Sequence, residues 1–417
     1  MYHASFWLAV VAAGVAVLFT TVDEVVAWGH VGHSLMGQVA MQLIRPETRL
    51  ALKKLLPGAD GNIALISSWA DEVKNEERYK GTGSLHFADT HDDPPYACSY
   101  VAARDCPNGD CITVAIQEFS WAVRNATLAA KVIPTLARRS VDARDDVEGL
   151  RSARIEWVDA QGRTRMPNRP PRRQLDPPAD RRVEEQTASH DPHPTKPPHH
   201  DNPPQEIPLG ERFTAVESLK FLVHLVQDIH QPLHVSGRER GGNDVQVVFN
   251  RHDANLHGVW DTLMLKKHMH DEFYGSEHAF ARDVVMELAT TWKGDVLSWV
   301  RCPLSMPGIN DSPAFVLQGD PGRSEELSYI SRDMLSHHGA IKTSRTGDPA
   351  PMSVVLCPEF WAQQSDQLNC GTIWQNLEED LAGAYHETNL PIARKAIAMG
   401  AVRLAALLDA VLAGMEV

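Results

Sequence analysis

The chain has 417 residues, of which 43% are hydrophobic, and its formal net charge is −14. That length can bury one large core or two ordinary ones, and the composition is typical of a globular protein. The acidic balance argues against a protein that holds duplex DNA through many phosphate contacts, because that mode needs clustered lysine and arginine.

The first 27 residues predict a secretory signal peptide. Residues 5–20 form an apolar run, and Val25 and Ala27 occupy the −3 and −1 positions of a small-residue cleavage pattern. No lysine or arginine precedes the run, so an amino-terminal membrane anchor is the alternative. Cleavage after Ala27 would make Trp28 the first residue and place the protein outside the cell or within the secretory pathway.

Three segments with candidate metal ligands follow. The first predicted helix begins near His33, and His30 competes with that residue as a ligand. Apolar spacing predicts another helix over 62–73, where Asp71 lies among apolar neighbours. Alone, an acid in such a place is more often a surface or packing residue. A short extended or irregular segment at 84–90 adds one more histidine and one more aspartate.

The cysteines are even in number, which after a signal peptide predicts disulfide bonds. The six are Cys98, Cys106, Cys111, Cys302, Cys357 and Cys370. The short spacing between Cys106 and Cys111 predicts a local bond, and spacing leaves the other pairings open. Asn125 and Asn310 begin acceptor sequences for N-glycosylation, which fits secretion.

Two segments interrupt the predicted domain, which runs from residue 28 to residue 417. The first, about 138–210, contains 12 of the 27 prolines together with many charged residues, so it cannot build a core. We interpret it as a disordered surface insertion and its histidines as part of a solvated linker rather than a metal site. A second loop insertion is predicted at about 304–350.

The segment 214–234 predicts the central helix. Its apolar residues recur at helical spacing, Thr214 and Glu217 form a capping box, and a proline ends the run. His224 and Asp228 lie one turn apart on one face, so both can hold the same cation. The alternative is a buried histidine hydrogen-bonded to an aspartate. His234 follows just past the helix end and could serve a second ion.

A second His-x-x-x-Asp pair weakens that alternative. A glycine-rich turn leads into a predicted strand or hairpin arm at 245–249, and His257 and Asp261 then repeat the spacing on a further helix. Two such pairs are hard to explain as independent core histidines. The remaining segments, 278–300 and 372–415, are helical in pattern, and charged residues within the amphipathic stretch 393–412 exclude a membrane span.

These motifs, in this order, closely resemble the class I nuclease family. They are Trp28-x4-His33, Ser68-Trp69-Ala70-Asp71, Leu85-His86-Phe87, His224-x3-Asp228 with Gln231-Pro232-Leu233-His234, Gly241-Gly242-Asn243-Asp244 and His257-x3-Asp261. The resemblance covers most of 28–136 and 211–300 and returns at 357–362. It implies an all-α fold, namely a single mainly helical domain of the zinc phospholipase C/class I nuclease type, with a small β hairpin and long loop insertions.

The resemblance also implies a function and a cofactor. The protein would be a secreted, monomeric, zinc-dependent phosphodiesterase that cleaves single-stranded DNA and RNA to 5′-phosphate products by in-line attack of a zinc-bridging hydroxide. It would also act as a 3′-nucleotidase, without stable duplex binding and without a membrane span in the mature chain. Three zinc ions are implied, with these ligands: Asp71, His86, His224 and Asp228 for the first; Asp228, His33 and the main chain of Trp28 for the second; His234, His257 and Asp261 for the third.

Further roles come from the same resemblance. Phe87 would stack on a base whose edge contacts Asp89 and Asn243, and stacking requires an unpaired base. Asp71 and Asp228 would be catalytic together with Lys74, which stands where the family usually has an arginine near the phosphate. Lysine supplies charge without the planar bidentate fork. The implied disulfide bonds are Cys98–Cys370 and, by remainder, Cys302–Cys357.

Two other functions are compatible with the pattern. A zinc phospholipase C has a similar trinuclear site and helical fold, but the glycine-rich loop and Asp261, where that family has glutamate, favour the nuclease. A secreted zinc-binding or adhesive protein without turnover is the alternative from a different class, and the complete ligand set counts against it. Assays with single-stranded DNA and phosphatidylcholine, together with zinc stoichiometry, separate the three.

Overall fold

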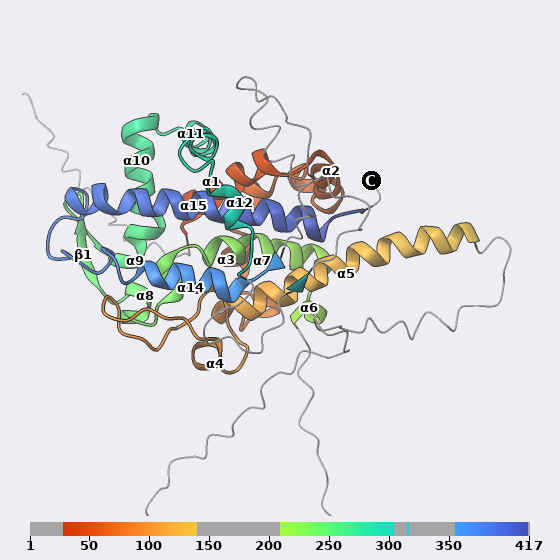
Figure 1. The fold of residues 1–417 in the computed structure, drawn as a ribbon, viewed down its shortest axis with the longest axis horizontal. Helices are drawn as coiled ribbons and strands as arrows, with labels where there is room; N and C mark the ends of the chain where they lie inside the picture. Colours follow the sequence, from red (N-terminus) through yellow and green to blue (C-terminus); the bar gives the residue numbers. More distant parts are fainter. Residues whose placement is uncertain (1–27, 140–208, 304–314, 317–354, 416–417) are drawn as a thin grey trace, which may run out of the picture.

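The computed structural model describes residues 28–139, 209–303, 315–316 and 355–415 (Figure 1). The described residues are mainly helical, with two small two-stranded sheets, which confirms the predicted fold class. The predicted signal peptide and most of both predicted insertions lie outside the described residues. None of the helices within the described ranges is both long and apolar enough to cross a membrane.

The chain is a succession of short and long helices, and a hairpin interrupts them. In chain order the elements are α1 His30–Leu43, α2 Pro46–Leu55, η1 Pro57–Ala59, η2 Ile63–Ile66, α3 Trp69–Val73, η3 Glu77–Tyr79, η4 Gly83–His86, α4 Ala102–Asp105, α5 Ile112–Arg139, α6 Leu209–Arg212, α7 Ala215–Asp228, η6 Pro232–Val235, α8 Glu239–Gly242, β1 Gln246–Phe249, β2 His252–Asn255, α9 Leu256–Gly258, η7 Val259–Leu263, α10 Met264–Phe273, α11 Glu277–Ala289, α12 Val296–Trp299, β3 Phe315–Val316, β4 Val355–Leu356, α14 Pro358–Leu368 and α15 Ala384–Val411.

Helix α7 is the centre of the core. It packs against α5, α15, α3 and α1 (Figure 1), and its second half is buried on all sides. The predicted capping box is present, because the Thr214 hydroxyl accepts from the backbone N–H of Glu217 at 3.2 Å and the Thr214 N–H donates to the Glu217 carboxylate at 2.8 Å. These bonds satisfy backbone donors that would otherwise lack a partner at the first turn. They therefore fix where α7 begins.

Helix α15 corrects one sequence prediction. The sequence predicts an amphipathic stretch over 393–412, but α15 is buried on nearly all sides from Ala396 to Val411. Its buried charged residues find partners on other segments: Arg403 donates to the Trp299 carbonyl at 2.9 Å, and one Asp409 carboxylate oxygen accepts from the backbone N–H of Arg45, the residue before α2, at 3.1 Å. Packing on several sides makes the helix part of the core.

The predicted helix over 62–73 is also wrong in detail. The chain forms η2 and α3 with a break at Ser67, whose carbonyl oxygen accepts a hydrogen bond from Nδ1 of His224 at 2.6 Å. Helix α1 lies close against this segment at Gly37, where a Cβ atom would come within 2.7 Å of the Ala64 Cα. The break therefore directs a backbone carbonyl at a candidate metal ligand, which a continuous helix would have kept in its own hydrogen-bond ladder.

The small sheet and the disulfide bonds agree with the sequence. Strands β1 and β2 form the predicted hairpin. The three disulfide bonds are Cys98–Cys370, Cys106–Cys111 and Cys302–Cys357. The first of these ties the loop after η4 to the end of α14, so it links two segments separated by 272 residues.

Removing residues 140–208 should leave the fold intact. The Leu209 N–H donates to the Glu118 carboxylate at 2.7 Å, so α6 lies beside the first half of α5, whereas the end of α5 at Arg139 extends away from the other helices (Figure 1). From Glu118 to Arg139 the helix rises about 30 Å, which a flexible replacement linker must cover. A proline-rich charged segment buries little apolar surface, and loop closure costs grow slowly with length.

We therefore expect the deletion variant, with such a linker, to keep the circular dichroism spectrum and the bound metal of the full chain. Loss of either one would show that the segment is structural.

Candidate metal centre

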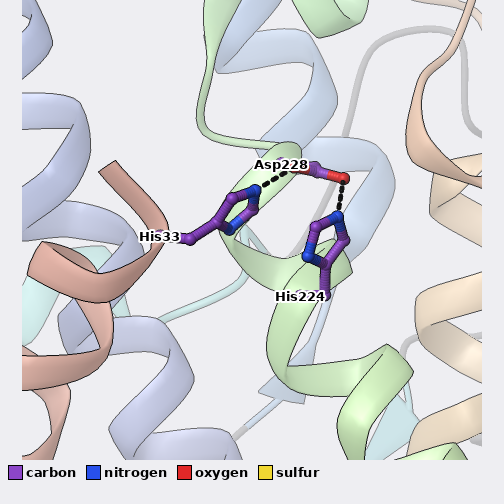
Figure 2. Close-up of side chains that lie close together, drawn as sticks. All are labelled: His33, His224 and Asp228. Atoms are coloured by element: carbon purple, nitrogen blue, oxygen red, sulfur yellow. Dashed lines mark ion pairs between the residues drawn. The ribbon is translucent and has the colours of Figure 1, made fainter. Parts of the chain in front are cut away.

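Asp228 at the end of α7 lies at the centre of a buried cluster (Figure 2). One carboxylate oxygen lies 3.2 Å from Nε2 of His33, and the other lies 3.0 Å from both Nε2 of His224 and Nδ1 of His86. His33 comes from α1 and His86 from the end of η4. His33, His224 and Asp228 have no exposed surface, and His86 is 4% exposed. His30, the competing candidate, is exposed.

Asp71 from α3 completes this cluster. Its carboxylate oxygens lie 3.5 Å from Nδ1 of His86 and 3.5 Å from Nε2 of His224. Lys74, at the end of α3, places its ammonium nitrogen 3.2 Å from the Asp71 carboxylate. The predicted cationic residue therefore lies next to the cluster and is paired with one of its carboxylates.

A second cluster lies immediately beyond the end of α7. His257 and Asp261 are 3.1 Å apart, and Nε2 of His234 lies 3.8 Å from the Asp261 carboxylate. Asp261 belongs to η7, a π-helical turn, a form that is frequent at functional sites. His234 also lies 3.8 Å from the Asp228 carboxylate, so the two clusters are contiguous.

Together these side chains form three groups in which the possible ligand atoms all lie within 4.8 Å of one another. The groups are His33, His224 and Asp228; Asp71, His86 and His224; and His234, His257 and Asp261. The structure thus brings together every side chain that the sequence predicted as a zinc ligand. Imidazole nitrogens and carboxylate oxygens in buried groups of this size suit Zn²⁺.

Hydrogen bonds to backbone carbonyls fix the tautomer of three of these histidines. The Nδ1 atoms of His224, His234 and His257 donate to backbone carbonyl oxygens at 2.6, 3.0 and 2.7 Å. A carbonyl oxygen only accepts, so Nδ1 carries the proton and the lone pair of a neutral ring is on Nε2. Those lone pairs are directed into the clusters, which is the arrangement that metal-binding histidines show.

Several buried polar atoms at the same place have no hydrogen-bond partner among the described residues. They are His33 Nε2, Asp71 Oδ2, His86 Nε2, Asp228 Oδ1, His234 Nε2 and Asp261 Oδ2. Leaving a buried polar atom without a partner costs about 1–3 kcal/mol. A concentration of such atoms at one place is the signature expected of groups that bind cations, so the residues fit a metal centre.

The charges of the site reinforce this fit. Burial disfavours a charge on His224, yet the carboxylates of Asp228 and Asp71 raise its pKa to about 9. Burial likewise opposes ionisation of Asp261, but the neighbouring imidazoles of His257 and His234 lower its pKa to about 2. The Asp261 carboxylate therefore keeps its negative charge at neutral pH, and a bound cation would compete with the histidine protons for it.

Two glutamines support the site and carry no spacing signal in the sequence. Gln227 accepts from Nδ1 of His33 at 2.6 Å, and Gln231 donates to the Asp261 carboxylate at 2.7 Å. Both are fully buried. Such partners orient metal-binding side chains. The sequence assigned neither glutamine a role, although Gln231 belongs to the quoted motif, because a glutamine close to a ligand in the chain looks like any other polar residue.

The predicted substrate residues lie at the surface next to the clusters. Phe87, which follows His86, is 39% exposed, and Asp89 is exposed as well. Asn243 is half-buried and donates to the Arg240 carbonyl at 2.8 Å.

The last predicted ligand residue, Trp28, is fully buried, and its indole N–H donates to the Gln227 carbonyl at 3.0 Å.

Comparisons with known proteins give a consistent result. Residues 28–138 and 205–319, more than half of the chain, match the family model S1/P1 Nuclease. Endonuclease 3 of Arabidopsis thaliana is 24% identical over 399 residues, which cover 95% of this chain and 92% of the relative. Nuclease S1 of Aspergillus oryzae is 23% identical over 92% of this chain and 91% of its own. Nuclease P1 of Penicillium citrinum is 23% identical over 66% of this chain and 72% of its own.

Proposed function

This chain belongs to the S1/P1 nuclease family, and from that premise we propose that it is a secreted, zinc-dependent nuclease and 3′-nucleotidase that acts on single-stranded DNA and RNA. The proposal rests on one observation: three buried groups of histidine and aspartate side chains lie together around Asp228 and Asp261. Products would be 5′-phosphates with free 3′-hydroxyl groups.

The proposed ligand sets use residues that lie together. Asp71, His86, His224 and Asp228 would hold one zinc ion; Asp228, His33 and the main chain of Trp28 would hold a second; His234, His257 and Asp261 would hold a third. The bound ions would supply Lewis acidity for activating water and for stabilising charge on phosphate oxygens. Asp228 is suited to join two sets because its two carboxylate oxygens face different histidines.

The residues around the clusters would bind and orient the substrate. Phe87 offers an exposed ring on which an unpaired base can stack, and Asp89 and Asn243 offer polar groups for the base edge. A base within a duplex presents no free face, so single strands would be favoured. Lys74 would supply positive charge beside Asp71, where the phosphate would lie.

The amino terminus would be completed by processing. Trp28 is fully buried beside α7, and cleavage of the predicted signal peptide after Ala27 would free its α-amino group for coordination. A chain that retains residues before Trp28 should therefore contain less zinc than the processed chain.

The proposal is tested by metal analysis of the secreted, processed chain together with product identification. We expect three zinc ions per chain, cleavage of a short single-stranded oligonucleotide to 5′-phosphate products identified by mass spectrometry, and much slower cleavage of the matched duplex. Release of phosphocholine from phosphatidylcholine at a comparable rate would favour the phospholipase. Full zinc loading without turnover on any of these substrates would refute an enzymatic function.

A further inference from the structure

The turn before Asn243 has an unusual backbone. Glu239, Arg240, Gly241 and Gly242 have φ angles of 45°, 53°, 63° and 80°, so four consecutive residues adopt the left-handed conformation. Glycine adopts it freely, whereas a side chain with a Cβ atom is strained there. The sequence nevertheless keeps two charged residues in the strained positions. Strain of this kind is a reason to look for a function.

The turn is attached directly to the metal centre. The Gly241 carbonyl accepts from Nδ1 of His257 at 2.7 Å, and a Cβ atom at Gly241 would come within 2.5 Å of the Leu233 carbonyl oxygen. Gly241 and Gly242 are buried, whereas Glu239 and Arg240 are exposed. The left-handed turn thus binds His257 through the Gly241 carbonyl and leaves the Arg240 side chain exposed to solvent at the edge of the site.

The predicted base-binding segment lies next to the chain that leads into this turn. The Ala88 N–H donates to the His234 carbonyl at 2.9 Å, so residues 86–90 run beside the chain that leads into the turn. Along this segment Phe87 and Asp89 are exposed and Ala88 is buried, so the two exposed side chains share one face.

Arg240 is near enough to this face for its charge to influence Asp89. Partial removal of the Asp89 carboxyl group from solvent raises its pKa, and the nearby side chains of His91 and Arg240 work in the opposite direction. The guanidinium of Arg240 has one ion-pair partner among the described residues, Asp244 at 3.1 Å, and both side chains are largely exposed. An exposed pair of this kind is weak, so the guanidinium can rearrange to meet a ligand.

We propose that Arg240 is a specificity-determining residue of the nuclease, whose guanidinium binds a backbone phosphate next to the scissile one while a base lies on Phe87. The inference rests on the proposed function. The chain as a whole carries a net charge of −14, so a polyanionic strand needs cations placed locally along its path. The planar fork of arginine matches phosphate oxygens. A substrate with only one phosphate offers nothing for this contact, so Arg240 favours oligonucleotides over 3′-mononucleotides.

The test compares Arg240→Gly with a matched control, Arg251→Gly. Arg251 is also an exposed arginine in the left-handed conformation, with φ of 68°, but it lies in the hairpin turn, where its N–H donates to Asp380 at 2.8 Å. Both substitutions remove one positive charge and relieve the same backbone strain. Arg240→Lys is the second variant, because it keeps the positive charge and removes the planar guanidinium group.

The measurements are KM and kcat of the secreted, zinc-loaded proteins on a single-stranded hexanucleotide and on a 3′-mononucleotide, at several salt concentrations. For Arg240→Gly we expect KM on the hexanucleotide to rise about fivefold and its logarithmic salt slope to fall by about 0.7, the value for one phosphate contact on a single strand. KM on the mononucleotide and zinc content should stay unchanged. Arg240→Lys should be intermediate, and Arg251→Gly should match the wild type on both substrates.

The outcomes separate this inference from the proposed function. Equal KM values and equal salt slopes for Arg240→Gly and Arg251→Gly on the hexanucleotide would overturn the role of Arg240 and leave the nuclease intact. A rise in KM of the same size on both substrates would also overturn it, because the contact would then lie at the scissile phosphate. A wild-type protein that cleaves neither substrate would refute the proposed function, and the inference with it.

Discussion

Asp228→Asn is expected to lower kcat by roughly 10³-fold or more on every phosphoester substrate, which corresponds to about 4 kcal/mol of transition-state stabilisation. The Asp228 carboxylate lies within 3.2 Å of nitrogen atoms of His33, His86 and His224 and has no exposed surface. An asparagine side chain has the same size as aspartate but offers only one oxygen, which is neutral. Its amide N–H groups would point toward the place that we assign to a cation. We therefore expect kcat to fall on all phosphoester substrates.

Zinc content and kcat on an oligonucleotide, a 3′-nucleotide and an aryl phosphodiester measure the effect. Asp253→Asn is the control, since it makes the same change at an exposed residue of β2. The assignment of Asp228 to two metal sites fails if Asp228→Asn keeps full zinc content and turnover within tenfold of the wild type.

Asp261→Asn should have an effect that depends on the substrate. Asp261 belongs to the group with His234 and His257. We propose that an ion held by this group would stabilise the leaving 3′ oxygen. Its loss should lower kcat about 10²-fold on an oligonucleotide, whose leaving oxygen is poor, and tenfold or less on an activated aryl phosphodiester. A leaving group that already bears negative charge well gains little from further stabilisation.

The comparison of the two variants on both substrates is decisive. Asp228→Asn should reduce both activities alike, and Asp261→Asn should widen the ratio between the aryl substrate and the oligonucleotide about tenfold. Equal losses for both variants on both substrates, with the remaining zinc still bound, would show that the two clusters do not divide the work in this way.

Local spacing explains why so much of the candidate metal centre could be anticipated from the sequence. His224 and Asp228, like His257 and Asp261, lie four residues apart, and the helical period brings such residues to one face wherever the helix is packed. The capping box at Thr214 is equally local, and it fixes the start of α7 without reference to the rest of the fold. The resemblance of the motifs to a family supplied the candidate ligands from distant segments, namely Trp28, His33, Asp71 and His86.

Other features depended on contacts that no spacing encodes. The break at Ser67 exists where its carbonyl accepts from His224, 157 residues further along the chain. The burial of α15 depends on the helices that surround it, so the amphipathic interpretation was wrong. The left-handed turn that carries Arg240 is held by Leu233 and His257, outside the turn itself.

The sequence by itself thus determined the family resemblance, the helical class and the types of side chain that converge, because composition, capping and helical period are properties of short stretches. Only the tertiary structure decided which carbonyls fix the tautomers of His224, His234 and His257, which glutamines contact the candidate ligands and which arginine lies on the turn that holds His257. These are relations between residues far apart in the chain, and they exist only once the packing of α7 against α1, α3, α5 and α15 has set their distances.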